Sequence, residues 1–303
     1  MEATIQDLFS LPDIGVTQKS NGNLVSNTKI GIEVEVEGIS EPPHIPGWRA
    51  IQDGSLRNNG IEYVFNAPIG GKSAETRINK LHEGLSDIDK DFSIRTSVHV
   101  HMDARDMTWK QVCDLVTLYA ITEPYLFAVC GQEREESIYA LSLYRGQQQV
   151  DNLSRIIRLG PEALNERLWT KYSAVNLLSL RSLGSLEFRG HEGTCDKDVL
   201  INWVNHLLSL KKFVMNPENS VASLPVLLSA QGLTPFLRKI FGDSLIRKNL
   251  RRVAQVADKI YHGVWVAEDI IHDSAIRNFQ HELLEKYRGT TQMEKIKDKL
   301  CAV

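Results

Sequence analysis

The sequence predicts an α+β fold in which an antiparallel sheet has one apolar face and one face rich in carboxylates and imidazoles. Two segments alternate strictly between apolar and other residues, residues 29–38 (KIGIEVEVEG) and residues 97–103 (SVHVHMD). Side chains of a strand point alternately to its two faces, so this period indicates two strands. A long, largely apolar helical pattern at residues 108–130 would cover the apolar face, and the chain beyond Thr194 also has helical patterns.

The composition is that of a globular protein with a large core, since 42% of the 303 residues are hydrophobic and 24% are charged. The net charge of −3 gives no general attraction for nucleic acid. The four cysteines are far apart and indicate neither a disulfide framework nor a cysteine zinc site. Residues 1–28 lack the pattern of a signal peptide, and Asp114 and Glu123-Pro124 interrupt the best candidate for a membrane helix. We therefore expect a cytoplasmic protein without a membrane partner.

Three regions are expected: an N-terminal lead (residues 1–28), a central domain that contains the predicted sheet (residues 29–215) and a helical C-terminal region (residues 216–303). The lead contains a short apolar patch and then a loop rich in Ser, Asn and Gly that leads into the first strand.

In the first strand Glu33, Glu35 and Glu37 lie on one face. Neighbours on one face of a strand are about 6.5–7 Å apart, so their mutual repulsion must be relieved by solvent or by a cation. A face that simply meets water is the alternative, because antiparallel sheets commonly have one wet face.

The next elements are a short strand at residues 48–52, a tight turn at Asp53-Gly54-Ser55 and a strand at residues 61–65 that could pair with the first of these. Glu62 lies on the opposite face from Ile61. Residues 70–73 (GGKS) suggest a phosphate-binding loop, but Asn66 stands where the first glycine of that motif belongs, and Pro68 removes a backbone donor. We expect a turn there, followed by a helix at residues 74–85.

The strand at residues 97–103 carries His99 and His101 on one face, together with Ser97 and Asp103. Two imidazoles at this spacing can ligate one metal, or one can ligate while the other contacts a substrate oxygen. A lone histidine on a sheet is more often structural, but two beside an acidic strand favour a functional site.

After the helix at residues 108–130 we expect a charged loop with Arg134 at residues 132–136, and a helix at residues 152–169 that is broken near Gly160-Pro161. Two strands, at residues 172–180 and 184–190, should follow, and in the second of these Glu187 and Arg189 share a face. They could form a surface ion pair, or a metal ligand beside a guanidinium that binds phosphate.

Helices are expected at residues 196–214, 225–241, 244–265 and 276–302. A basic run in the third of them suits the solvent side of a helix, with contact to an acidic partner as the alternative. It consists of Arg247, Lys248, Arg251 and Arg252.

A strand with E-x-E, a strand with H-x-H and a late strand with E-x-R, in this order, resemble the glutamine synthetase and glutamate-cysteine ligase superfamily of carboxylate-amine ligases. Within it the chain is most similar to the amidoligase family, often found in bacteria and their phages. The resemblance covers residues 30–194 and rests on these motifs: G-x-E-x-E from Gly31, D-G-S from Asp53, Glu62 ahead of Pro68, H-V-H from His99, K-Y-x-x-x-N with Tyr172 and Asn176, and E-F-R-x-x-E-G-T from Glu187. After Glu62 the sequence Y-V-F-N-A-P departs from the family's usual L-V-S-P-like run.

The resemblance implies a glutamine synthetase-like antiparallel sheet with a concave active-site face, and helices on the convex face. It implies an ATP-dependent ligase that forms an amide through an acyl phosphate, with ATP and two Mg²⁺ or Mn²⁺ ions. The implied metal ligands are Glu33, Glu35 and Glu62, with His99 and Glu187 at a second position. The implied nucleotide and catalytic groups are His101 and Arg189, with Glu62 also catalytic and Arg134 as a further nucleotide contact. The implied substrate contacts are Asp53, Ser55, Tyr172 and Asn176.

Two alternatives remain open from the residues: a zinc-dependent hydrolase, and a scaffold or interaction protein that has lost activity. For the ligase, the partners would be small-molecule or peptide carboxylates and amines, and an oligomer is compatible with the sequence. The strand phases predict that six side chains point into one concavity: Glu33, Glu35, Glu62, His99, Glu187 and Arg189. They also predict that the opposite faces are buried under helices: Ile30, Ile32, Val34, Val98, Val100, Leu186 and Phe188.

Overall fold

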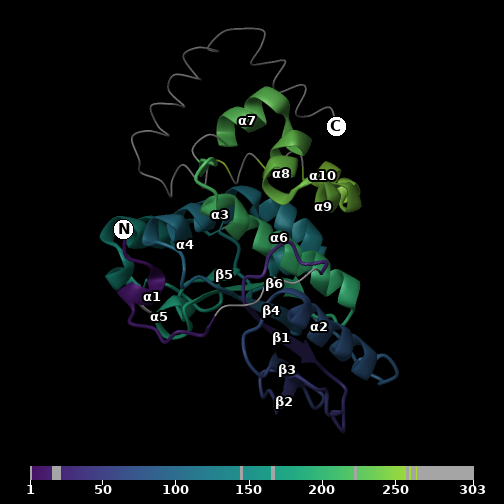
Figure 1. Cartoon of the computed structure of the whole chain (residues 1–303). Coiled ribbons are helices and arrows are strands. Elements are labelled where there is room, and N and C mark those ends of the chain that lie inside the picture. The colour runs from purple at the N-terminus through teal and green to yellow at the C-terminus, as the bar shows by residue number, and fades with distance from the viewer. Residues whose placement is uncertain are drawn as a thin grey trace.

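A six-stranded antiparallel sheet with helices packed on one face forms the centre of the protein (Figure 1). The computed structural model describes residues 2–15, 22–143, 146–164, 168–221, 224–256, 259–260 and 264. The strand order is β2-β3-β1-β4-β6-β5, and every neighbouring pair is antiparallel. The strands are β1 (Ile30–Val36), β2 (Trp48–Gln52), β3 (Ile61–Phe65), β4 (Ser97–Asp103), β5 (Val175–Asn176) and β6 (Ser185–Glu192). The predicted α+β class is confirmed.

The helices before β6 are α1 (Ile5–Leu8), α2 (Gly71–Leu85), α3 (Trp109–Cys130), α4 (Gln147–Leu159) and α5 (Ser179–Leu183), with short 3₁₀ helices η1 (Gln132–Glu136) and η2 (Pro161–Ala163). Among the described residues, those after it are α6 (Lys197–Met215), α7 (Leu224–Gln231), α8 (Leu233–Phe241), α9 (Asp243–Lys248) and α10 (Leu250–Gln255).

Helices α3 and α6 form a layer on the sheet, since α3 packs on β6 and α6 packs on both β4 and α3. Helices α7 to α10 lie on the far side of this layer from the sheet (Figure 1). Thr108 caps α3 and pairs reciprocally with Gln111, and Asp196 caps α6 by accepting from two backbone N–H groups, so both helices begin where their unpaired donors are satisfied.

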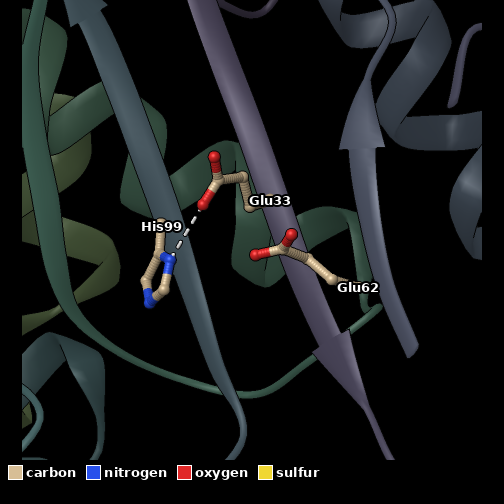
Figure 2. Close-up of side chains that lie close together, drawn as sticks. All are labelled: Glu33, Glu62 and His99. Atoms are coloured by element: carbon tan, nitrogen blue, oxygen red, sulfur yellow. Dashed lines mark hydrogen bonds and ion pairs between the residues drawn. The ribbon is translucent and has the colours of Figure 1, made fainter. Parts of the chain in front are cut away.

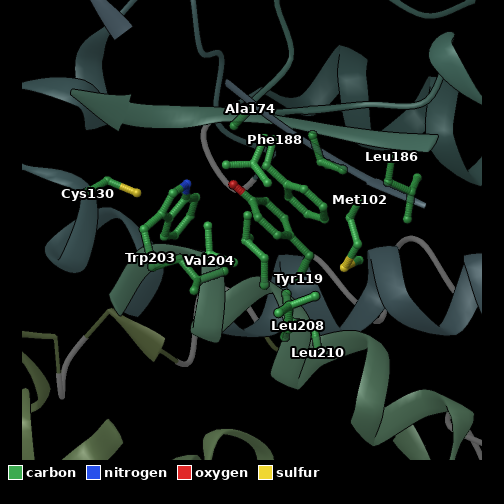
Figure 3. Packing of buried hydrophobic residues seen from close by; sticks show 14 of the residues in the cluster. Met102, Tyr119, Cys130, Ala174, Leu186, Phe188, Trp203, Val204, Leu208 and Leu210 are labelled. Carbon is green, nitrogen blue, oxygen red and sulfur yellow. The ribbon is translucent and has the colours of Figure 1, made fainter. Parts of the chain in front are cut away.

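The apolar strand residues are buried beneath these helices, as the alternation predicts. Ile30, Ile32, Val34, Val98, Val100, Leu186 and Phe188 are all at most 1% exposed. Phe188 packs against Tyr119 of α3, with ring centroids 5.6 Å apart (Figure 3). The same buried cluster includes Ile5 of the lead and Val253 of α10, so described residues from all three expected regions contribute to one core.

Several predicted elements differ from the structure. The strand expected at residues 172–180 is only two residues long, because the chain turns into α5 and closes it with Gly184 at φ 62°. The helix expected at residues 152–169 begins earlier, at Gln147, and ends at Leu159; Gly160 has φ 92°, so the predicted break near Gly160-Pro161 is confirmed. Gly232, at φ 83°, divides the helix expected at residues 225–241 into α7 and α8. These conformations favour glycine, since a Cβ would be strained there.

The helix expected at residues 244–265 is divided at Asn249, but the solvent exposure predicted for its basic run is confirmed at Arg247, Lys248 and Arg251. Arg247 and Lys248 end α9, whereas Arg251 and Arg252 lie in α10. Arg252 is half-buried and donates from Nη1 to the carbonyl of Val129 at 2.6 Å, so it ties α10 to the end of α3. The helix expected at residues 276–302 lies outside the described residues.

The helix predicted at residues 74–85 begins earlier, at Gly71, so only Gly70 of the GGKS segment precedes it. A Cβ on Gly70 would lie 2.3 Å from the carbonyl oxygen of Asn27. Only glycine fits this close approach of two backbones. The glycine therefore has a packing explanation.

By length and composition α3 is apolar enough to cross a membrane, contrary to the expectation from Asp114 and Glu123-Pro124. Of its 18-residue apolar window, 83% is buried inside the fold. A core helix passes the same test, and burial of this kind is what the core helix of a globular protein shows.

Phe188→Ala should lower the free energy of unfolding by about 3–5 kcal/mol, because it leaves a cavity between β6 and α3. Urea denaturation would measure the loss. The control is Ile51→Thr on edge strand β2, where the side chain is 43% exposed, and it should change stability by no more than about 0.5 kcal/mol. Equal losses in the two variants would contradict this assignment of the core.

Candidate active site

The strand register brings carboxylates and imidazoles together on the sheet face opposite the helices. Glu33 of β1 lies opposite His99 of β4. Glu35 of β1 lies opposite Glu62 of β3, and His101 of β4 lies opposite Glu187 of β6. The prediction that these groups share one face is therefore confirmed. We call this face, with Arg189, the acidic face.

Glu33 is the central group of the acidic face. Its Oε2 lies 3.0 Å from Nδ1 of His99, and its Oε1 lies 3.4 Å from Nε2 of His101. Glu62 approaches from the other side, so that Glu33, Glu62 and His99 each offer a ligand atom within 4.8 Å of the others (Figure 2). A single cation could bridge three such atoms.

Two further groups of the same kind share members with the first. Glu33, His101 and Glu187 form one, and Glu35, Asp53 and Glu62 form the other, again with ligand atoms within 4.8 Å of one another. His99 Nδ1 lies 3.9 Å from Glu187 Oε1, close enough for the expected pairing, and the register also sets His101 opposite Glu187. Asp53, expected to contact substrate, lies among the carboxylates.

Glu35 and Glu37 have local partners. Glu35 accepts hydrogen bonds from the backbone N–H of Ser97 at 2.8 Å and from its hydroxyl at 2.6 Å. That hydroxyl oxygen also lies 2.7 Å from Nε2 of His99, so Ser97 joins Glu35 to His99. Glu37, predicted to continue the row, lies beyond the end of β1 and accepts from the backbone N–H of Arg57 at 2.8 Å.

A β-bulge positions Arg189. The pairs on either side of it are Val98 with His191 and Val100 with Phe188. Arg189 and Gly190 therefore both lie opposite the single residue His99, and bulges of this kind re-aim a side chain next to a site. The Arg189 guanidinium donates to Glu187 and lies 3.5 Å from Nδ1 of His99.

Arg134 stabilises this bulge by hydrogen bonds to backbone carbonyl groups. It is 2% exposed, and its Nη2 donates to the carbonyl of Arg189 at 3.0 Å, while Nη1 donates to the carbonyl of Ile94 at 3.4 Å. A buried carbonyl at a break in the ladder needs a donor, and Arg134 provides it. Sequence reasoning assigned Arg134 to the nucleotide, whereas its described contacts are with the protein backbone.

The remaining predicted substrate residues differ in their distance from the acidic face. Asn176 is buried and donates to Glu187 Oε2 at 2.6 Å. Ser55 donates its backbone N–H to Asp53 at 2.8 Å, which holds the turn that carries Asp53. Tyr172 is 40% exposed and packs edge-on against Tyr139, with ring centroids 6.3 Å apart. Asn176 and Asp53 thus belong to the acidic face, whereas, among the described residues, Tyr172 contacts Tyr139 and no group of that face.

The electrostatics of the acidic face separate its carboxyl groups. Burial alone would raise the pKa of Glu33, but hydrogen bonds and charges from His101 and His99 outweigh it and hold the pKa far below its usual range. Burial likewise opposes ionisation of Glu187, and Arg189 together with the histidines and Asn176 lowers its pKa overall. Burial opposes charging of His101, yet Glu33 and Glu187 raise its pKa.

Glu62 behaves in the opposite way. Burial, and then the charges of Glu33, Glu35 and Asp53, raise the pKa of Glu62 to about 8. The protein without a cation therefore holds a proton on Glu62 at neutral pH, because the carboxylates around it repel a further negative charge. A cation bound there would displace that proton.

Sequence reasoning missed several supporting groups. Ser185 contacts Nδ1 of His101 at 3.1 Å through its hydroxyl oxygen, and the carbonyl of Tyr139 accepts from Nε of Arg189 at 3.4 Å. The bulge had a signal, since Gly190 interrupts a strand pattern and glycine in a strand often marks a bulge. The sequence also contained a signal for Ser97, because Ser97 lies on the same strand face as the two histidines.

No protein-family model and no curated protein matches the chain.

Replacing Glu62 by Gln should change how stability depends on pH in the cation-free protein. The unfolded chain releases this proton near the ordinary pKa of 4.5 and the folded protein near about 8, so wild-type stability falls as pH rises through this window. Glu62→Gln removes that loss. Its melting temperature in EDTA should therefore rise relative to wild type between pH 5 and about pH 8.

The exposed Glu41→Gln variant serves as the control, and its melting curve should remain parallel to wild type across the same pH range. Parallel curves for Glu62→Gln as well would show that Glu62 ionises like an exposed carboxyl group.

Proposed function

We propose that the protein is an ATP-dependent carboxylate-amine ligase of the amidoligase type, with a glutamine synthetase-like sheet whose concave face is the acidic face. The observation that carries the proposal is the position of Arg189 beside two overlapping groups of cation ligands, Glu33 with His99 and Glu62, and Glu33 with His101 and Glu187. Transfer of a phosphoryl group needs cations and a guanidinium where negative charge accumulates.

The donor sets fit Mg²⁺ or Mn²⁺. Each contains two or three carboxylates and at most one imidazole, and oxygen-rich sets of this kind suit these cations. When bound, the cations would neutralise charge on the ATP phosphates. The raised pKa of Glu62 supports this fit, because it reports an excess of negative charge on the acidic face.

The reaction balances in two steps. An oxygen of the substrate carboxylate attacks the γ-phosphorus of ATP, the bond to the β-phosphate oxygen breaks, and ADP leaves. The amine nitrogen then attacks the acyl carbon, phosphate leaves, and the nitrogen loses a proton. Arg189 would bind the phosphoryl oxygens, with Glu187 holding its guanidinium in place, and His101 would contact the phosphate or the acceptor carboxylate.

A zinc hydrolase is the less favoured reading. Catalytic zinc sites commonly use three histidines, two histidines with a glutamate, or cysteines with a histidine. Among the described residues, no group of possible ligands contains two histidines or a cysteine. An arginine next to the ligands is also better suited to phosphate than to water activation.

Mg²⁺ or Mn²⁺ should raise the melting temperature, and ATP should raise it further, because each binds the folded state and relieves repulsion among the carboxylates. Glu33→Gln should blunt the response, since Glu33 belongs to two of the ligand groups. Thermal denaturation with and without each ion would measure this. Stabilisation by Zn²⁺ alone would favour the hydrolase.

Arg189→Ala should lower turnover by at least ~100-fold, the scale for removing a donor that stabilises developing charge, while ATP binding weakens less. Arg189→Lys should also be poor, because an ammonium group cannot make the two-pronged contact. The assay is ADP release over a panel of carboxylate and amine pairs, with hydroxylamine to trap the acyl phosphate.

Arg251→Ala is the matched control, because Arg251 is exposed on α10, and its turnover should stay near wild type. Binding of ATP without metal-dependent ADP release or a hydroxamate from any pair would favour the inactive scaffold. If ATP does not bind, the resemblance to carboxylate-amine ligases would concern the fold alone and not the function.

A further inference from the structure

A cavity of about 920 Å³ opens beside the acidic face, between the segment before β4 and the segment after η1. Its size lies within the range of about 300–1,000 Å³ that is typical of ligand pockets. The two most exposed large apolar side chains among the described residues, Ile94 at 72% and Ile138 at 68%, both line it, and Phe92 lines it too. Exposed apolar groups that gather around one cavity suggest that a ligand covers them.

The cavity is joined to the acidic face by Tyr139. The Tyr139 hydroxyl accepts a hydrogen bond from Nη1 of Arg95 at 3.1 Å, and its carbonyl accepts from Nε of Arg189 at 3.4 Å. Tyr139 therefore lies between two guanidinium groups, one in the cavity wall and one at the proposed phosphate position. An anionic ligand in the cavity would therefore lie close to the Arg95 guanidinium, with the Arg189 guanidinium on the other side of Tyr139.

Arg95 is held in place on both sides. Besides Tyr139, its Nη1 donates to the carbonyl of Ser55 at 3.4 Å, in the turn that carries Asp53. Both contacts use one terminal nitrogen of a group that has five N–H donors. The guanidinium is thus pre-positioned to bind a carboxylate with its other donors, in the two-pronged geometry that suits this anion.

The charges of the cavity wall argue against a polyphosphate. Arg95 and Arg134 are balanced there by Glu136 and Glu192, so the wall has no net positive charge. A nucleotide triphosphate would bring several negative charges to a wall without net positive charge, whereas a single carboxylate needs only the one positioned guanidinium of Arg95, and its apolar group meets an apolar surface.

From these contacts we infer that the cavity binds the side chain of the carboxylate substrate, and that this substrate is an amino acid or peptide carboxylate with an apolar side chain. The apolar group lies against Ile94, Ile138 and Phe92, and the carboxylate is bound by Arg95, on the side of the cavity where Tyr139 contacts Arg189. That the bound carboxylate is a substrate rests on the proposed ligase function. Binding of the carboxylate in the cavity does not depend on that function.

The test is calorimetric titration of the full chain with N-acetyl-leucine, N-acetyl-phenylalanine and N-acetylglycine, without nucleotide or cation. The two apolar carboxylates should bind more tightly than N-acetylglycine. Ile94→Ser combined with Ile138→Ser should weaken their binding at least about tenfold, the scale for losing apolar contacts in a pocket, and bring it near that of N-acetylglycine. Arg95→Gln should weaken all three.

Leu159→Ser is the matched control, because Leu159 is 54% exposed and does not line the cavity; it should bind like wild type. No binding of any of the three compounds, or binding unchanged by the cavity variants, would overturn the inference. Binding as expected without ADP release from any pair would instead reject the ligase and keep the cavity as a carboxylate site.

Discussion

Charge compensation between neighbouring strands is the constraint on which the acidic face depends. Glu33 meets two imidazoles, Glu35 meets Ser97, and Glu187 meets Arg189 and Asn176. A carboxylate buried without such partners would cost several kcal/mol, so each strand can place its acidic residue only where the next strand supplies a donor. Compensation is incomplete at Glu62, and this makes the face receptive to cations.

The sheet and its covering helices could be predicted because alternation and apolar periodicity are local properties of the sequence. The strand limits at β2, β3 and β4 and the helix α3 agree with the predictions. The short β5 could not be predicted in the same way, since residues such as Val175 and Leu180 suit a strand as well as the start of a helix. The pairing with β6 and the turn at Gly184 determine where β5 ends and α5 begins.

The candidate site was predicted as a face but not as a set of contacts. A two-residue period gives the side on which Glu33, His99 and Glu187 lie, whereas the partner of each group depends on the register between strands far apart in sequence. The position of His101 opposite Glu187, for example, follows from the β4–β6 register and not from the period of either strand. The roles of Arg134, Arg95 and Tyr139 depend on loops whose path no periodic pattern reveals.

The bulge at Arg189 also has a consequence for how the chain selects its own strand pairing. In a regular ladder the residues after Phe188 would alternate, so that Glu192 would point under the helices and His191 would point to the acidic face. With the bulge, His191 lies against Trp203 in the core, and Glu192 is exposed. A pairing slipped by one residue would bury a charge in an apolar layer. A β4–β6 pairing without the bulge would thus be an unstable folding product, and the charge of Glu192 discriminates against it.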